Sequence, residues 1–84
     1  MKHAISPAQS RAARALVGLT REGLADASGV PSRTVADFEL GSTTPRAGTV
    51  GKIVAALQSA GVEFIAENGG GPGVRLRKVQ PPGA

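Results

Sequence analysis

The stretch that decides the fold is residues 20–41, which read TREGLADASGVPSRTVADFELG. Thr20 has a side chain suited to an N-cap, so we expect a helix to begin after it and to end about two turns later at Gly29. A second helix is expected to open at Pro31, because proline favours the first turn of a helix, and to end near Gly41. Two short helices separated by about three residues around a glycine are typical of a helix-turn-helix.

Two further helices are expected on either side of this stretch. Residues 6–9 read SPAQ, the pattern of a capping box with proline at the first helical position, so the first helix should cover 7–17 and stop at Gly18. The last helix should cover about 47–60 and stop at Gly61. The apolar residues at helical spacing in the last three helices are Leu24, Ala25, Val35, Phe38, Val50, Ile53, Val54 and Leu57.

The chain beyond the last helix alternates apolar and polar residues with a period of two, on both sides of the glycine-rich stretch 68–73. This pattern predicts a β-hairpin. Pairing Phe64 with Leu76 would place Glu63 opposite Arg77, a favourable cross-strand pair. The glycine-rich stretch has no Lys-Ser/Thr pair and opens no helix, so we interpret it as a turn and not as a phosphate-binding loop.

Composition limits the kinds of function. The chain has 84 residues, a formal net charge of +4 and no cysteine, which favours polyanionic partners and excludes disulfides and thiolate metal sites. The only histidine, His3, stands near the N-terminus and is interpreted as incidental. Only Phe38 and Phe64 are aromatic, which favours duplex DNA over single strands that stack on aromatic rings. No apolar run is long enough to span a membrane, so a cytoplasmic protein is expected.

Residues at fixed spacing within and around the motif mark one family: Leu24-Ala25, Gly29-Val30, Thr34-Val35, Glu39 and Gly41, with Arg14 upstream and Pro45 downstream. With these marks, residues 5–61 resemble the phage-repressor-like (XRE-type) helix-turn-helix family. The resemblance implies a mainly α fold, a four-helix lambda-repressor-like DNA-binding domain, and a bacterial transcription regulator. The sequence departs from the family at Gly23, where a capping glutamate is common, and at Ser42, where a basic residue is frequent.

The expected organisation has three parts. Residues 1–61 form the helix-turn-helix DNA-binding domain, with its motif at 20–41. Residues 62–79 form the C-terminal β-hairpin, which stands where the family's usual fifth helix would be. Residues 80–84 are expected to be a disordered tail.

The base-reading residues are expected at the start of the second motif helix, which points at base edges in such motifs. They are Ser32, Arg33, Thr34 and Asp37. Arg33 can pair bidentately with guanine, and Thr34 can meet a thymine methyl group. Asp37 can either accept a hydrogen bond from cytosine or orient Arg33 from one turn away, and both roles stay open.

Contacts to the DNA backbone are expected from two places. Thr20 and Arg21 stand at the start of a helix, where free amides and the positive end of the helix dipole favour phosphate. The resemblance implies that the loop after the motif lies against the next stretch of backbone. Its polar residues are Ser42, Thr43, Thr44 and Arg46, although Arg46 can equally be a solvated side chain.

Two further sets of residues are given structural roles. The resemblance implies a salt bridge between Arg14 and Glu39 that joins the first helix to the recognition helix, so Glu39 has no catalytic role. The hairpin is the candidate dimer interface, because no fifth helix is available and strands can pair across a two-fold axis. Its candidate interface residues are Val62, Phe64, Val74 and Leu76.

The sequence therefore predicts a DNA-binding transcriptional regulator, either a repressor or an autoregulator, that reads the major groove of an operator as a homodimer. The alternative is a protein-interaction module, such as an antitoxin or antiactivator, that keeps the fold. No nucleophile–base pair or cluster of metal ligands supports an enzyme, and no cofactor or metal is expected.

Overall fold

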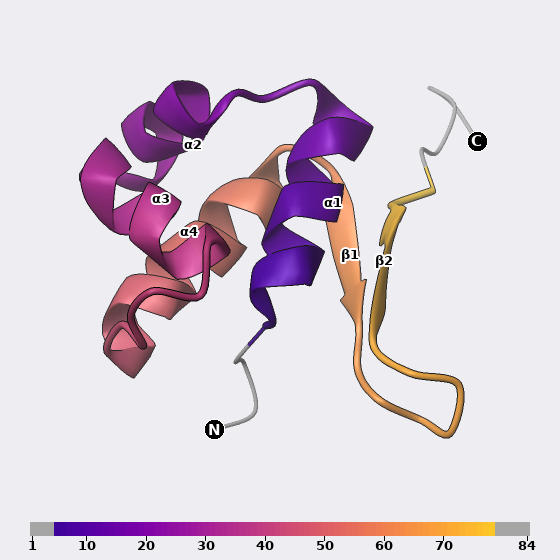
Figure 1. Cartoon of the computed structure of the whole chain (residues 1–84). Helices are drawn as coiled ribbons and strands as arrows, with labels where there is room; N and C mark the ends of the chain where they lie inside the picture. The colour runs from indigo at the N-terminus through magenta and orange to yellow at the C-terminus, as the bar shows by residue number, and fades with distance from the viewer. Residues whose placement is uncertain (1–4, 79–84) are drawn as a thin grey trace, which may run out of the picture.

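The computed structural model describes residues 5–78, which form four helices followed by a two-stranded antiparallel hairpin (Figure 1). The elements are α1 (Pro7–Val17), α2 (Arg21–Ser28), α3 (Ser32–Glu39), α4 (Ala47–Ser59), β1 (Val62–Ile65) and β2 (Gly73–Leu76). The predicted fold class is confirmed. His3 and the predicted tail 80–84 lie outside the described residues. Within the described part of the chain, no helix has the length and apolar character needed to cross a membrane.

The starts of α1 and α2 follow from side-chain caps, whereas α3 and α4 begin without one. The capping box predicted for α1 is present, since Gln9 N donates to Ser6 Oγ at 3.0 Å and Ser6 N donates to Gln9 Oε1 at 2.9 Å. The hydroxyl of Thr20 caps α2 by accepting from Gly23 N at 2.9 Å. Gly29 ends α2 with a φ of 75°, a left-handed conformation that glycine adopts without steric cost. These local signals explain why the helix limits could be predicted to within about one residue.

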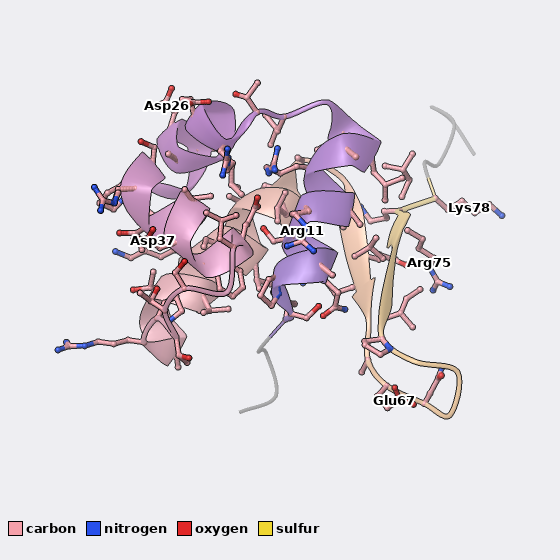
Figure 2. All side chains as sticks on the ribbon, in the orientation of Figure 1. Arg11, Asp26, Asp37, Glu67, Arg75 and Lys78 are labelled. Atoms are coloured by element: carbon pink, nitrogen blue, oxygen red, sulfur yellow. The ribbon has the colours of Figure 1, made fainter. Side chains whose placement is uncertain are left out.

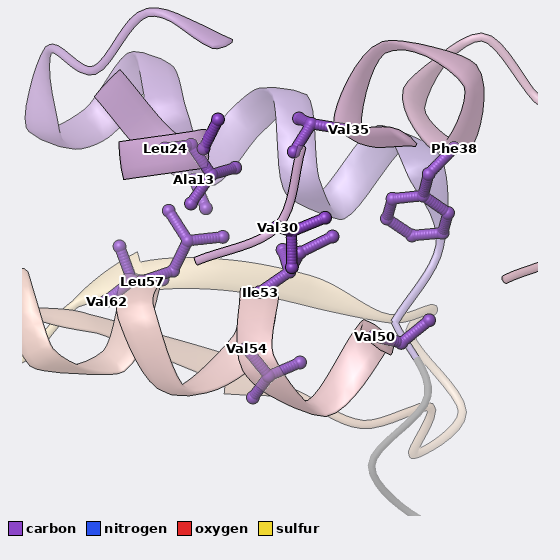
Figure 3. Packing of buried hydrophobic residues seen from close by; sticks show 11 residues of the cluster. Ala13, Leu24, Val30, Val35, Phe38, Val50, Ile53, Val54, Leu57 and Val62 are labelled. Carbon is purple, nitrogen blue, oxygen red and sulfur yellow. The ribbon is translucent and has the colours of Figure 1, made fainter. Parts of the chain in front are cut away.

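The hydrophobic core lies where all four helices meet the start of the hairpin. Leu24 of α2, Val35 of α3, and Ile53 and Leu57 of α4 are completely buried. Val62, the first residue of β1, extends the same cluster (Figure 3). One face of the hairpin is packed onto the helices, because α1 contacts both strands and α4 contacts β1.

The hairpin register differs from the predicted one by two residues. Phe64 lies opposite Val74, and Glu63 lies opposite Arg75, so the predicted pairs of Phe64 with Leu76 and of Glu63 with Arg77 are wrong. The reason lies in contacts outside the strands. The guanidinium of Arg77 donates to the carbonyl of Gln58 at 3.0 Å, near the carboxyl end of α4, where helices leave free acceptors. Arg77 is therefore engaged with α4, and Glu63 pairs with Arg75.

The glycine-rich connection forms a closed turn. Gly69 N and Gly71 N both donate to the carboxylate of Glu67, at 2.9 and 3.2 Å, and Gly70 N donates to the side chain of Asn68 at 3.2 Å. Three amides that a phosphate would need are thus engaged by the chain's own side chains. This arrangement supports the interpretation of the stretch as a turn.

Gly51 in α4 provides a test of how the helix is stabilised. A methyl group added there would meet no atom within 4 Å, so Gly51→Ala should raise the free energy of unfolding by about 1 kcal/mol through helix propensity. Gly29→Ala is the matched control: it also meets open space, but its φ of 75° makes alanine strained there, so it should lower stability by about 1 kcal/mol. Urea unfolding of both variants measures the two shifts. Shifts of the same sign would contradict this account.

Candidate nucleic-acid interface

The connection between α2 and α3 is fixed by three consecutive residues. Ser28 Oγ accepts a hydrogen bond from Val30 N at 3.2 Å, across the left-handed Gly29. Val30 itself is buried in the core. The turn therefore holds the start of α3 in a defined position relative to α2.

One face of α3 is anchored and its amino-terminal end is exposed. Val35, Phe38 and Glu39 are buried against the rest of the chain. Ser32 and Arg33, at the start of the helix, are exposed to solvent. A helix with its side chains is about 10–12 Å wide and the major groove about 12 Å, so an exposed helix end of this kind fits the groove.

The four predicted base-reading residues are brought to one end of α3 but differ in exposure. The side chain of Arg33 is 89% exposed, and its Nε lies 3.6 Å from Oδ2 of Asp37, one turn later. This contact fits the orienting role considered for Asp37, and it leaves the guanidinium accessible. Thr34 and Asp37 are half-buried, so Ser32 and Arg33 offer the most accessible polar groups.

The predicted backbone-contacting residues lie around this end. Arg21 is the first residue of α2 and is exposed. The hydroxyl of Thr20 accepts from Gly23 N and so caps α2, and its O–H can still donate to a phosphate. The connection from α3 to α4 exposes Ser42, Thr43, Thr44 and Arg46. Figure 1 shows α2, α3 and the start of α4 together on one side of the molecule, with the hairpin on the other.

Arg14 and Glu39 form the ion pair that joins α1 to α3. Arg14 Nη2 lies 2.7 Å from Glu39 Oε1, and its Nε donates to both carboxylate oxygens, at 3.1 and 2.9 Å. Glu39 is only 1% exposed. The hydrogen bond to Glu39 raises the pKa of Arg14, although burial acts in the opposite direction. The raised pKa favours the charged guanidinium, which is the form that pairs with Glu39.

These elements match a known family. A comparison with protein families assigns residues 11–64, more than half of the chain, to the family HTH_3, described as Helix-turn-helix. The chain belongs to the HTH_3 family. This family consists of non-enzymatic DNA-binding domains of the XRE type. A comparison with curated proteins gives no match. The match begins inside α1, covers α2 to α4 and ends inside β1.

Sequence reasoning missed two residues that hold α3 of this HTH_3 domain against α1. Ser10 Oγ donates to Glu39 Oε2 at 2.6 Å from a completely buried position. The guanidinium of Arg11 donates to the backbone carbonyl of Glu39, at the end of α3. The signal available in the sequence was spacing: residues three and four before Arg14 lie on the same face of α1.

The hairpin residues predicted at a dimer interface are mostly turned toward the protein's own core. Val62 is completely buried, so its side chain cannot reach a partner and it is removed from the candidates. Phe64 and Val74 are partly buried and pack against the same core. Leu76 alone of the four is largely exposed, at 54%. A strand that follows a helix directly begins close to it, which explains the burial of Val62.

Within residues 5–78, no group of three or more histidine, aspartate or glutamate side chains is placed to hold a metal ion.

Proposed function

We propose that this HTH_3 domain is a sequence-specific, duplex DNA-binding transcriptional regulator that reads the major groove with α3. The observation that carries the proposal is the 89% exposed side chain of Arg33 at the free end of a helix whose other face is buried. A guanidinium in this setting can donate two parallel hydrogen bonds to a guanine edge. Ser32 adds a hydroxyl beside it.

The remaining predicted contacts complete this proposal. Arg21 and the exposed connection 42–46 bind phosphates and fix the register on the duplex, without carrying sequence information. In this proposal residues 1–61 carry DNA binding, and the hairpin is an interaction element packed onto them. The protein acts in the cytoplasm on DNA of the nucleoid, as a repressor or autoregulator.

We further propose that two copies bind a two-fold symmetric operator, because one short helix covers only a few base pairs and dimers read half-sites about 34–36 Å apart. Sedimentation of the full chain, free and on duplex DNA, tests this. A monomer under both conditions would contradict it. The same sedimentation of the Leu76→Lys variant tests whether Leu76, the exposed residue of the hairpin, contributes to dimer formation. Deleting the hairpin would be a poor test, since Val62 belongs to the core.

The main test is selection of bound fragments from random duplex DNA. We expect a short motif to be enriched, with at least one position at which guanine dominates, because Arg33 is the accessible bidentate donor. Arg75→Ala is a suitable control protein, because Arg75 lies on β2, on the side away from α3, and the variant should select the same motif (Figure 2). Recovery of no motif would reject sequence-specific reading.

A second candidate function is a protein-interaction module, and one observation favours it: β2 has a free edge and an exposed leucine. The two functions are compatible in one chain. Failure of the DNA selection, together with binding of a protein segment at β2, would favour the interaction module alone.

A further inference from the structure

The outer edge of β2 has unpaired backbone groups. The sheet described in residues 5–78 has only two strands, so one side of β2 pairs with β1 and the other side pairs with no strand. Arg77 N donates to Gly61 O at 2.7 Å, which fixes the alternation of the antiparallel ladder. Glu63 and Arg75 then exchange hydrogen bonds within the hairpin. The N–H and C=O groups of Val74 and Leu76 consequently point outward.

The two faces of β2 differ in chemistry. Val74 and Leu76 lie on the face that packs toward the helices, and Leu76 remains 54% exposed. Arg75 lies on the opposite face, and Arg77 and Lys78 follow β2 directly, with the guanidinium of Arg77 donating to the carbonyl of Gln58. Within residues 5–78, Glu63 pairs with Arg75, and Glu67 is engaged by the loop amides. The edge is therefore flanked by a basic face and an apolar face.

These charges oppose pairing of β2 with a second copy of itself. A symmetric antiparallel pairing centred on residue 75 or 76 places Arg75 opposite Arg75 or Arg77 of the other copy. Like charges directly opposite each other destabilise a strand pair. Positively charged edge strands are also a known means of preventing self-association.

We propose that the outer edge of β2 binds an extended segment of a partner protein in which acidic and apolar residues alternate. Backbone hydrogen bonds to Val74 and Leu76 add the segment as a third strand. Its acidic residues lie beside Arg75 and Arg77, whose charge the neutral carbonyl of Gln58 does not cancel, and its apolar residues pack on Leu76. The Arg75–Glu63 pair does not prevent this, because an exposed ion pair is weak and its arginine has further donors.

This surface is separate from the DNA-reading end of the molecule. Figure 2 places Arg75 and Lys78 on the hairpin side and Asp37 on the opposite side, on α3. The proposal goes beyond DNA binding and does not depend on it. A segment bound at β2 leaves α3 free, so a partner can be recruited to DNA or can be held without DNA.

A short peptide of alternating glutamate and valine tests the proposal on the full-length protein. At saturation, amide hydrogen exchange at Val74 and Leu76 should slow by about tenfold or more, whereas the amide of Arg75, already paired with β1, should change little. Binding should weaken with added salt, and the same peptide with lysine in place of glutamate should bind at least about tenfold more weakly.

Two variants of one residue separate the backbone contact from the side chain. Leu76→Pro removes an outward N–H without touching the ladder to β1 and should weaken peptide binding by about tenfold, the effect of one lost hydrogen bond. Leu76→Val keeps the N–H and should bind within about twofold of the natural protein.

Equal binding of both variants, equal binding of the lysine peptide, or no slowing of exchange at Val74 in the unmodified protein would overturn the proposal. Slowing of the same amides by duplex DNA or by self-association would assign the edge to DNA or to a second copy, and would also overturn it.

Discussion

Replacing Glu39 with alanine is expected to lower the free energy of unfolding by about 3–5 kcal/mol, the usual effect of removing one partner from a buried ion pair. The carboxylate is 1% exposed and accepts hydrogen bonds from Arg14 and from the buried hydroxyl of Ser10. Its loss leaves both donors without their acceptor, in a place that water reaches poorly. Small domains are stable by only about 5–15 kcal/mol, so the variant should be partly unfolded at physiological temperature.

Glu63→Ala is the matched control for this experiment. Glu63 lies 2.8 Å from Arg75 Nε, a distance close to the 2.7 Å of the Arg14–Glu39 pair, but the side chains of the control pair are 67% and 41% exposed. An exposed pair contributes about 0–1 kcal/mol, so the control should unfold almost like the natural protein. Urea titration measures both variants through their midpoints. Similar losses in the two would show that burial does not set the strength of the Glu39 pair.

The Glu39 pair also explains how the scaffold serves DNA binding. Glu39 is the last residue of α3, and its side chain and its carbonyl are bound by three residues of α1. This end of α3 is therefore fixed to α1, while the opposite end, with Arg33, faces solvent. A substitution at the exposed end of α3 therefore leaves these anchoring contacts in place.

The helices could be predicted because their ends depend on nearby residues. Ser6, Gln9, Thr20 and Gly29 act on amides and carbonyls within four residues of themselves. The hairpin register could not be predicted in the same way, since it depends on long-range contacts such as the bond from Arg77 to Gln58. A period-two pattern identifies the faces of a strand but not its exact partner.

The candidate site also combines residues that local spacing predicted with residues whose role depends on long-range packing. The helix-turn-helix spacing located the end of α3, and Ser32 and Arg33 are exposed there as expected. Ser10 escaped notice because a serine between Gln9 and Arg11 gives no compositional signal of burial, and only its spacing from Arg14 pointed to a shared helix face. Its importance depends on a carboxylate 29 residues away, which only the packing of α1 on α3 brings near.

Arg33→Ala is expected to weaken binding to the selected operator by about 1–3 kcal/mol, or about 5- to 150-fold, and to relax preference at one base position. The reason is that the guanidinium recognises the fixed pattern of acceptors on one base edge. Alanine has no donor and cannot recognise that pattern. Arg21→Ala removes a similar exposed charge from the start of α2, so it should weaken binding to all sequences alike.

Salt dependence separates the two roles in one set of titrations. Each lost phosphate contact reduces the slope of log K against log salt concentration by about 0.9, so Arg21→Ala should flatten the slope. For Arg33→Ala the slope should stay nearly the same while the ratio of operator to random-sequence affinity falls. Fluorescence anisotropy with operator and scrambled duplexes, at several salt concentrations, measures both quantities. Equal losses on every sequence for both variants would refute this division, and would mean that Arg33 contributes charge rather than base recognition.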